Sequence, residues 1–508
     1  MEYVAAVDQG TTGTRCLLFD RAGRVAGEAY ETHEQHYPKP GWVEHDPAEL
    51  WTNTKAVVAE ALAAADAAAT DLAALGLTNQ RETTVLWDAE TGEPVGNALV
   101  WQDRRTTERV EELEREGKAE WIRERTGLEP DAYFSATKAE WLLDADPVRT
   151  DRGATRDRRE RAADGDLLLG TVDSWLVWKL TGEHATDATN ASRTMLFDIR
   201  ALEWNDDLLA EFGVPEAALP EVHASSDPEA YGTTDRDGFL GAEVPVAGVL
   251  GDQQAALFGQ TCFEAGEAKN TYGTGSFLLA NTGTEPVASD HGLVTTVAFQ
   301  RAGEPPKYAL EGSIFVTGAA VEWLEDVSLV DSPAETETLA RSVDSTDGVY
   351  VVPAFTGLGA PHWDGRARGT ILGITRGTRR EHIVRATLES VAYQTRDVLE
   401  AMEADSGEEI ESLRVDGGAV RNDFLCELQA GILGREVVRP ALDETTALGA
   451  AYAAGLAVGY WEGLAALREQ WRVDRSFAPA MDGDRADARY DRWGEAVERA
   501  RDWARDEA

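Results

Sequence analysis

The sequence predicts an α/β fold made of two related halves, and three observations support this prediction. A strand–turn–strand pattern covers residues 3–20, and the same pattern returns at residues 269–281. Each copy has a Gly/Thr-rich turn between apolar runs, which is typical of a β-hairpin. Elsewhere, at residues 244–258 and 413–433, an apolar run leads through a polar turn into a helical segment. Strand, polar turn and helix is the unit of open α/β sheets, whose ligands gather at the carboxyl ends of the strands.

Two further helices can be placed from local signals. Asp46 can serve as an N-cap, Pro47 fits the first helical position, and Glu49 completes the first turn. The helix that they open should continue to about Ala69. Near the other end of the chain, residues 447–461 are rich in Ala and Gly, which predicts a helix packed closely against a sheet.

The second hairpin also sets the division into domains. The best boundary lies near Gly251, before that hairpin, so we predict an N-terminal domain of residues 1–251 and a C-terminal domain of residues 252–508. The C-terminal domain should end in charged helices, because the tail from Asp482 is helical in pattern and dense in charge.

The composition restricts the possible partners. The 508 residues include 48 Lys and Arg against 92 Asp and Glu, a net charge of −44. Such a surface repels phosphate backbones and anionic lipids, so we expect no nucleic-acid partner and no membrane insertion. Only seven residues are Lys. Excess carboxylates with scarce Lys fit a surface that stays hydrated in concentrated salt, so we expect a halophilic protein from a salt-accumulating cytoplasm.

The cysteines and the N-terminus predict a soluble, cytoplasmic protein. Cys16, Cys262 and Cys426 lie far apart and lack CxxC spacing, which argues against a disulfide framework and for a reducing compartment. The first residues show no signal-peptide pattern. The most apolar stretch, residues 447–461, is too short to span a bilayer.

The two hairpins predict a shared phosphate site. Their turns crowd backbone N–H groups and hydroxyls, which makes an anion-binding concavity. A single Gly/Thr turn is too common to imply a ligand. One such turn near the start of each half, however, favours two domains that face the same phosphate.

Two polar clusters allow both a structural and a chemical interpretation. Asp252 follows a predicted strand and opens a predicted helix. It can be the N-cap of that helix, or a general base that accepts a hydroxyl proton as a phosphoryl group arrives. Arg81 and Glu82 follow the strand at residues 73–77. They can form a solvated turn, or supply donors and acceptors to a small polyol.

Several ordered motifs resemble those of the FGGY family of carbohydrate kinases, within the superfamily of sugar kinases, actin and chaperone ATPases. They extend over nearly the whole chain, at residues 8–12, 37–46, 78–83, 251–260, 270–275 and 369–389. The resemblance implies two actin-like (ribonuclease H-like) ATPase domains around a central interdomain cleft. It also implies an enzyme that uses ATP and Mg²⁺ to phosphorylate glycerol to sn-glycerol 3-phosphate, feeding glycerol catabolism and lipid backbone supply.

The resemblance further implies which residues bind the substrate. Glycerol would be held by Arg81, Glu82, Trp101, Tyr133, Asp252, Gln253 and Phe277. A triol needs paired donors and acceptors, and such a site strongly rejects a substrate that lacks a hydroxyl. The three aromatic residues of this set could equally be ordinary core residues.

For the nucleotide, the resemblance implies a site shared by both halves. ATP would be held by Thr11, Thr12, Gly13 and Arg15 on the first hairpin, by Thr274 and Gly275 on the second, and by Gly318, Glu322, Gly418 and Asn422. Mg²⁺ would bridge the phosphates near Asp8, which could otherwise be a turn-starting residue. Asp252 would take the proton of a terminal hydroxyl while Arg15 and Mg²⁺ stabilise the transferring group.

Some positions depart from the pattern of the family. Glu322 stands where relatives often have Gln, and Gly13 stands where some have Ser. Residues 231–239 add carboxylates where bacterial relatives bind fructose bisphosphate, and residues 479–484 differ from the loop that docks a phosphotransferase regulator. We therefore expect both of these sites to be absent. Relatives form dimers and tetramers, so we expect a homo-oligomer.

Two alternatives remain open. The substrate could be a pentulose, erythritol or another polyol, although Arg81-Glu82 with Tyr133 and Gln253 favours glycerol. The chain could also be a catalytically idle ATP-binding scaffold. The intact Asp252 and the paired hairpins argue against that second alternative.

Overall fold

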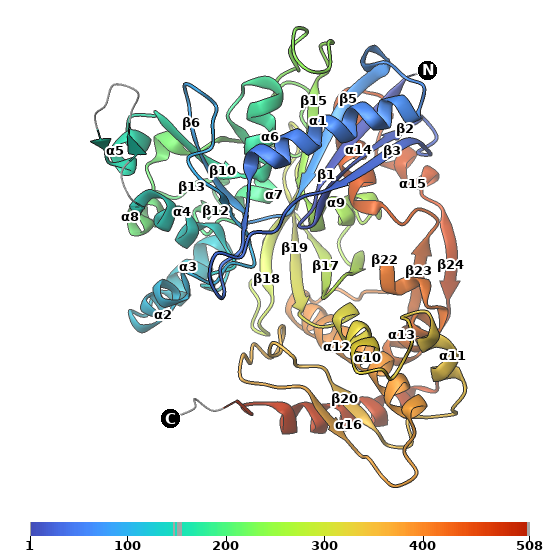
Figure 1. The fold of residues 1–508 in the computed structure, drawn as a ribbon. Coiled ribbons are helices and arrows are strands. Elements are labelled where there is room, and N and C mark those ends of the chain that lie inside the picture. Colours follow the sequence, from blue (N-terminus) through green and yellow to red (C-terminus); the bar gives the residue numbers. More distant parts are fainter. Residues whose placement is uncertain (1, 146–147, 150–154, 505–508) are drawn as a thin grey trace.

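Two mixed β-sheets, one in each half of the chain, organise the molecule (Figure 1). The computed structural model describes residues 2–145, 148–149 and 155–504. The five-stranded sheet of the first half has the order β3-β2-β1-β5-β15. Its strands are β1 (Tyr3–Gln9), β2 (Gly13–Phe19), β3 (Val25–Thr32), β5 (Leu72–Asn79) and β15 (Val246–Gly251).

The second sheet repeats this arrangement. Its seven strands contain the order β19-β17-β16-β22-β23, with β18 and β24 at the edges. In each half three antiparallel strands are followed by two strands that join in parallel. This repetition confirms the prediction of two related α/β halves. The strands are β16 (Ala268–Tyr272), β17 (Ser276–Gly283), β18 (Val294–Phe299), β19 (Lys307–Ile314), β22 (Ser412–Gly417), β23 (Glu436–Pro440) and β24 (Val473–Phe477).

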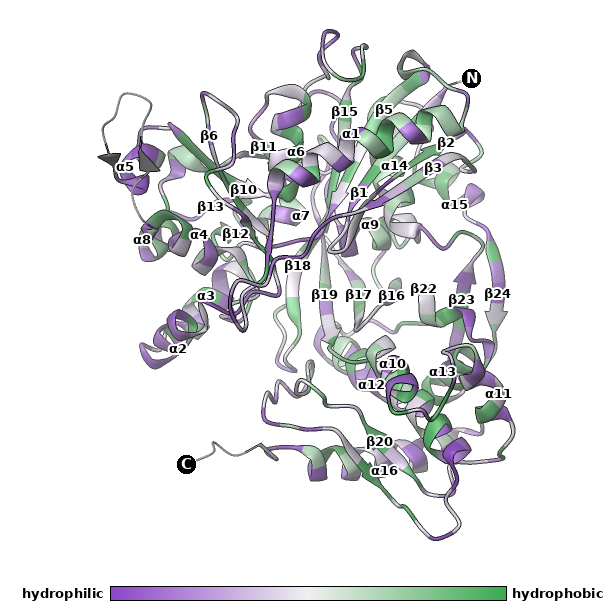
Figure 2. Ribbon diagram, in the orientation of Figure 1, coloured by the Kyte–Doolittle hydropathy of each residue, from purple (hydrophilic) through white to green (hydrophobic). Residues whose placement is uncertain are grey.

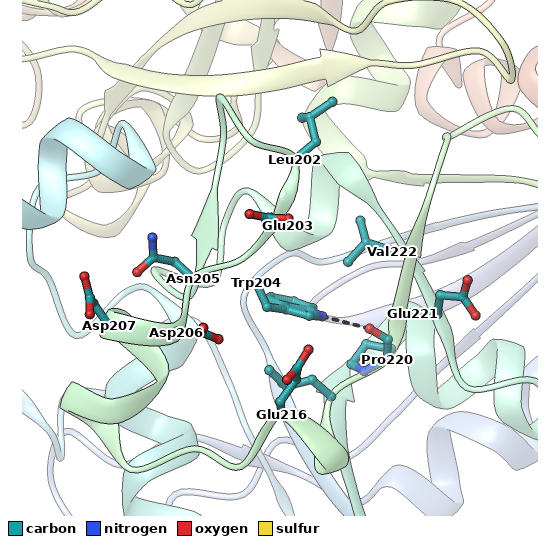
Figure 3. Close-up of a pocket in the computed structure, with 11 residues that line it drawn as sticks. Leu202, Glu203, Trp204, Asn205, Asp206, Asp207, Glu216, Pro220, Glu221 and Val222 are labelled. Carbon is teal, nitrogen blue, oxygen red and sulfur yellow. Dashed lines mark hydrogen bonds between the residues drawn. The ribbon is translucent and has the colours of Figure 1, made fainter.

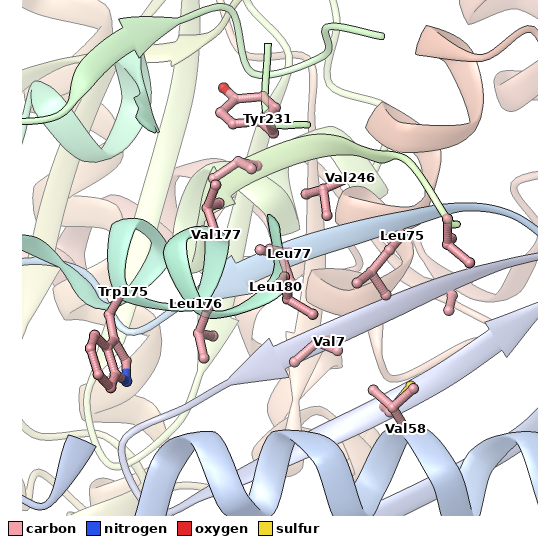
Figure 4. Close-up of a cluster of buried hydrophobic side chains, with 14 of the residues drawn as sticks. Val7, Val58, Leu75, Leu77, Trp175, Leu176, Val177, Leu180, Tyr231 and Val246 are labelled. Atoms are coloured by element: carbon pink, nitrogen blue, oxygen red, sulfur yellow. The ribbon is translucent and has the colours of Figure 1, made fainter. Parts of the chain in front are cut away.

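Helices cover both faces of the first sheet. Side chains alternate between the two faces of a strand. On one face, Val7 and Leu75 pack against α1 (Pro47–Ala64) and α6 (Val172–Thr181), including Val58 and Leu180 (Figure 4). On the other face, Val4 belongs to a cluster that includes helix α14 (Thr445–Ala457).

Helix α14 lies so close to the first sheet that two positions beneath it, Gly76 and Gly248, have no room for a side chain. A Cβ at Gly76 of β5 would lie 2.3 Å from the carbonyl oxygen of Ala450, and one at Gly248 of β15 would lie 2.4 Å from the backbone nitrogen of Ala454. Backbones also meet where α14 crosses α9 (Asp252–Gly259), since a Cβ at Gly449 would lie 1.8 Å from the carbonyl oxygen of Ala255. The close packing predicted for this Ala/Gly-rich helix is confirmed, and a helix from the second half of the chain covers the sheet of the first.

Helix α1 begins as predicted and ends earlier. The Asp46 side chain accepts a hydrogen bond from the Ala48 backbone nitrogen at 2.9 Å, so Asp46 is the N-cap. The helix ends at Ala64 rather than near Ala69. Asp66 has a φ of +50°, in the left-handed region, which stops the helix there.

The rest of the first half forms a second layer beside the sheet. It contains a four-stranded sheet of order β10-β6-β7-β4. In Figure 2, α2 (Thr107–Arg115) in this region is mostly hydrophilic, whereas β1 and β5 of the first sheet are largely hydrophobic. The elements are β4 (Glu44–His45), β6 (Thr84–Asp88), β7 (Ala98–Leu99), α2 (Thr107–Arg115), α3 (Ala119–Thr126), α4 (Ser135–Asp144), β8 (Val148–Arg149), β9 (Thr155–Arg156), α5 (Arg158–Ala163), β10 (Leu167–Thr171), β11 (Ala185–Asp187), α7 (Ala188–Ala191), β12 (Phe197–Asp198), β13 (Glu203–Trp204), α8 (Asp206–Phe212) and β14 (Glu221–His223).

The second half ends in the charged helix that the sequence predicts. Helix α16 (Gly483–Ala500) has Asp482 as its N-cap, and Trp493 on its buried face stacks on Tyr393 of α12 (Arg380–Ser406) with 5.5 Å between ring centroids. No helix within the described ranges is long and apolar enough to cross a lipid bilayer. The remaining elements are α10 (Gly318–Asp326), α11 (Glu335–Arg341), β20 (Tyr350–Val352), β21 (Thr370–Leu372), α12 (Arg380–Ser406), α13 (Asp423–Leu433), α15 (Leu464–Gln470) and α16 (Gly483–Ala500).

Candidate active site

Both predicted hairpins form, and their tips are closed in the same way. In the β1–β2 hairpin the Gly10 backbone nitrogen donates to the Gly13 carbonyl oxygen at 2.9 Å. In the β16–β17 hairpin the Gly273 nitrogen donates to the Gly275 oxygen at 2.8 Å. Thr11 and Thr12 lie at the first tip and Thr274 at the second.

The first hairpin is packed against its neighbouring strand. A Cβ at Gly13 would lie 2.5 Å from the Tyr30 hydroxyl and 2.6 Å from the Glu31 carbonyl oxygen, so Tyr30 of β3 occupies the space that a side chain would need. The Arg15 guanidinium lies 5.1 Å from the centre of the Tyr30 ring. Arg15 also forms an ion pair with Glu444, the residue before α14, which joins the two halves of the chain.

Asp8 lies near the carboxyl end of β1, opposite Arg15 in the strand register. Burial and, to a smaller extent, the Asp252 carboxylate raise the pKa of its carboxyl to about 7, against the lowering effect of the Arg15 guanidinium. Asp8 and Asp252 are therefore near enough to interact electrostatically, although they belong to different predicted domains.

Asp252 is the first residue of α9, and the N-cap of that helix is Gly251. The N-cap interpretation of Asp252 is therefore wrong. The Asp252 Oδ1 accepts a hydrogen bond from the Gln253 backbone nitrogen at 2.7 Å and lies 3.1 Å from the Arg81 Nε. Its side chain keeps 30% of its exposure. One carboxylate oxygen is thus fixed by the protein while the group still reaches solvent.

Arg81 and Glu82 do not form a solvated turn, because both are almost completely buried. The two terminal nitrogens of Arg81 bind the carboxylate of Glu311 at 2.5 and 3.1 Å. Arg193 donates to Glu82 at 2.7 Å and to the same Glu311 at 3.0 Å. The backbone of Glu82 has a φ of +62°, a left-handed conformation that costs energy in a residue with a side chain.

This buried network of two arginines and two glutamates shifts the pKa values of its members. Burial raises the pKa of Glu82, against the lowering effect of both arginines. For Glu311 the two arginines outweigh burial and hold the pKa at about 2. Glu311 comes from β19 of the second sheet, whereas its partners come from the first half. Sequence reasoning missed Arg193 and Glu311, because neither residue lies in one of the motifs that resemble the family.

The predicted aromatic residues connect the substrate set to the first hairpin. The Trp101 indole nitrogen donates to the Thr11 hydroxyl at 2.9 Å, and Trp101 and Tyr133 meet edge to face at 5.5 Å. Phe277 lies with its ring centre 5.8 Å from the Arg81 guanidinium. Lys138, which is buried, donates to the carbonyl oxygens of residues 132, 133 and 134 and so fixes the segment that carries Tyr133.

Four predicted nucleotide residues line one cavity of about 540 Å³ in the second half. They are Gly318, Glu322, Gly418 and Asn422. A Cβ at Gly318 would lie 2.4 Å from the Gly273 carbonyl oxygen, so this glycine permits α10 to begin directly on the second hairpin. A Cβ at Gly418 would meet nothing within 4 Å. The volume is that of a small-molecule site, and the hairpin tip forms part of its wall.

A larger cavity, of about 750 Å³, contains none of the predicted site residues. It lies between residues 202 and 222, where carboxylates surround Trp204 (Figure 3). The Trp204 indole nitrogen donates to the Pro220 carbonyl oxygen at 2.9 Å. Among the described residues that line this cavity none is Lys, Arg or His, so its size alone does not make it the chemical centre.

Comparisons with known proteins match both halves of the chain to one family. Residues 3–259 match the N-terminal domain of the FGGY family of carbohydrate kinases, and residues 268–458 match its C-terminal domain. Glycerol kinases from Haloferax volcanii and Haloarcula marismortui are 69% and 67% identical over 506 residues, which cover 99% of each chain.

Solved structures agree in fold. Glycerol kinase from Plasmodium falciparum, solved with ADP, is 36% identical, with a TM-score of 0.92 over 98% of both chains. A xylulose kinase from Lactobacillus acidophilus is 19% identical over 98% of this chain and 97% of that one, and its TM-score of 0.85 shows the shared fold alone. The predicted pair of actin-like domains is thereby confirmed. The chain belongs to the FGGY family of carbohydrate kinases.

Proposed function

We propose that the protein is a glycerol kinase that transfers the γ-phosphoryl group of ATP to a terminal hydroxyl of glycerol. The observation that carries this proposal is the identity of 69% with a protein named glycerol kinase over 99% of both chains. The product would be sn-glycerol 3-phosphate, which serves glycerol catabolism and supplies the backbone of lipids.

The proposed substrate site combines charge with an apolar wall. Arg81 and Gln253 would donate to hydroxyl oxygens, and Glu82 would accept from hydroxyl hydrogens. Trp101, Tyr133 and Phe277 would lie along the carbon side of the triol. Buried polar groups of this kind are left unpaired by a substrate that lacks a hydroxyl, which gives strong selectivity.

Asp252 is the proposed general base. Its Oδ1 is held by the Gln253 backbone nitrogen and by Arg81, which leaves Oδ2 to accept the hydroxyl proton. A base must be aligned with the proton that it removes, and an oxygen fixed by two donors keeps the other oxygen in one orientation.

The proposed nucleotide site spans both halves. The purine and ribose would occupy the cavity of about 540 Å³ that Gly318, Glu322, Gly418 and Asn422 line. The phosphates would extend between the two hairpin tips, where Thr11, Thr12, Gly13, Thr274 and Gly275 offer hydroxyls and backbone N–H groups. Arg15 would exchange its ion pair with Glu444 for a phosphate and stabilise the charge on the transferring group.

Mg²⁺ fits the chemistry of Asp8. Burial, together with the neighbouring Asp252 carboxylate, raises the pKa of this carboxyl to about 7, and a divalent cation would restore its charge. Mg²⁺ keeps several waters and needs only one or two carboxylates in addition to substrate phosphates. The proposed Mg²⁺ site therefore needs no cluster of three or more ligating side chains. Among the described residues, no group of three or more His, Cys, Asp or Glu side chains could hold a metal ion. When bound, the ion would neutralise charge on the ATP phosphates.

The test is ADP production that depends on glycerol, measured at high salt with and without Mg²⁺. Erythritol and xylulose are assayed side by side with glycerol. The proposal requires the highest kcat/KM on glycerol. A higher kcat/KM on either other substrate would replace glycerol, and no ADP production on any of the three would favour an idle ATP-binding scaffold.

A further inference from the structure

Lys269 on β16 is fully buried and contacts two residues of the proposed substrate site from behind. Its ammonium group donates to the Gln253 Oε1 at 2.6 Å and to the Phe277 carbonyl oxygen at 3.1 Å. A third bond goes to the Thr271 hydroxyl at 3.0 Å. An ammonium group has three N–H donors, so all of them are used within the protein and none is left for a ligand.

The contact between Lys269 and Gln253 fixes the orientation of the Gln253 side-chain amide, that is, which positions its oxygen and its nitrogen occupy. An ammonium group can only donate, so the amide atom that faces it must be the oxygen. The nitrogen of the amide is then turned away from Lys269, and among the residues that the structure describes this nitrogen donates to no protein group. Gln253 therefore presents two N–H donors on its free side and no acceptor.

We propose that Lys269 is a positioning residue for phosphoryl transfer, which orients the Gln253 amide to donate to a substrate hydroxyl oxygen and ties the start of α9 to the second hairpin. The proposal rests on the proposed function, because it deepens the role of Gln253 in that same site. It also names the chemical requirement on the substrate: a hydroxyl oxygen that accepts at this position while its own hydrogen is directed elsewhere.

The location of Lys269 suits a role in joining α9 to the second sheet. Its three acceptors lie on α9, β16 and β17, and α9 also carries Asp252. Charged groups that act on Lys269 are Asp416, Glu311, Asp252 and Arg81. Burial is the largest influence and lowers the pKa of the ammonium to about 8, so the charge is retained near neutral pH at some cost. A buried cation of this kind is normally kept only where its hydrogen bonds are needed.

The experiment measures KM for glycerol and for ATP separately, at high salt, in the wild type, Lys269→Met, Gln253→Leu and the double variant. Lys269→Met should raise KM for glycerol about tenfold or more, as expected for losing a hydrogen bond that a charged group holds in place, and leave KM for ATP within about twofold. If Lys269 acts through Gln253, the double variant should be no worse than Gln253→Leu alone. Additive losses, or equal rises of both KM values, would overturn the proposal.

A second variant tests the orientation of the Gln253 amide without removing Lys269. Gln253→Glu keeps a partner for Lys269 and replaces the free N–H donors by an acceptor, so KM for glycerol should again rise about tenfold or more while stability is kept. Unchanged KM in this variant would refute the orientation argument even if Lys269→Met failed to fold.

Thr271→Val provides the matched control. It removes one acceptor of Lys269 but leaves the bond to Gln253, so KM for glycerol should stay within about threefold of the wild type. A rise as large as that of Lys269→Met would point to general loss of packing and overturn the proposal. The wild-type measurement alone tests the proposed function, which fails if the wild type has no activity on glycerol. If the wild type is active but the losses from Lys269→Met and Gln253→Leu add up in the double variant, only the proposed role of Lys269 is refuted.

Discussion

Asp252→Asn separates the chemistry of the site from its architecture. The asparagine Oδ1 can still accept from the Gln253 backbone nitrogen at the 2.7 Å position and face the Arg81 Nε at 3.1 Å. That rotamer places an amide nitrogen where the wild type has Oδ2. A donor would then meet the substrate hydroxyl instead of an acceptor, and no group would take the proton.

The expected loss follows from these contacts. General-base catalysis contributes about 10²–10⁴-fold to a rate, so kcat should fall by that factor, which equals about 3–5 kcal/mol at 1.36 kcal/mol per tenfold step. Stability should change by less than about 1 kcal/mol, because Arg81 keeps its two bonds to Glu311 and the Asp252 side chain is partly exposed. Binding of ADP should be unchanged.

The assay is glycerol-dependent ADP production at high salt, with ADP affinity measured by calorimetry on the same samples. Asp206→Asn is the matched control, since Asp206 is also the first residue of a helix, is exposed and belongs to neither hairpin. Its kcat should equal that of the wild type. If Asp252→Asn kept more than a tenth of the wild-type kcat, Asp252 would not be the base.

Four further results are expected. Gly13→Ser should lower the free energy of unfolding by about 1–3 kcal/mol, because Tyr30 and the Glu31 carbonyl occupy the space; an unchanged melting temperature would contradict this. Glu311→Gln should lower the free energy of unfolding, measured by chemical denaturation, by about 3–5 kcal/mol, because two buried arginines lose their shared carboxylate. A loss below about 1 kcal/mol would show that other groups pair with these arginines. The pKa of Asp8 is raised from 3.8 to about 7, so without Mg²⁺ this residue lowers the free energy of unfolding progressively from about pH 4 to pH 7. The gain in the free energy of unfolding from Asp8→Asn should therefore grow across that range and level off above it. A gain that stayed constant with pH would contradict the shifted pKa. Dialysis into low salt should lower the melting temperature, because the net charge of −44 is then less screened, and full stability there would remove the halophilic interpretation.

Local chemistry was enough to predict the elements that carry the site. The Gly/Thr turns specify two hairpins, and Asp46 with Pro47 specifies the start of α1, because these features act over a few residues. The end of α1 was not predictable in the same way. Residues 65–68 contain no glycine or proline, and the left-handed backbone of Asp66 depends on the packing around it.

The residues that hold the site together were not predictable from local sequence. Glu311 lies 230 positions from Arg81 in the chain, and Lys269 orients Gln253 across two elements. A buried charge is recognised by its partners, and those partners meet only once both sheets have formed. The family resemblance supplied the residues assigned to ligands, whereas the structure adds the residues behind them. The ligand assignments themselves stay predictions.

The placement of α14 has a consequence for cutting the chain in two. A fragment that ended at residue 251 would expose Val4, Ala6 and Ala74 to water, because α14 is the cover of that face. The complementary fragment would carry an apolar helix without the strands that it shields. A motion that separated the two halves while keeping the backbone contacts of α14 at Gly76 and Gly248 would have to carry α14 along with the first sheet.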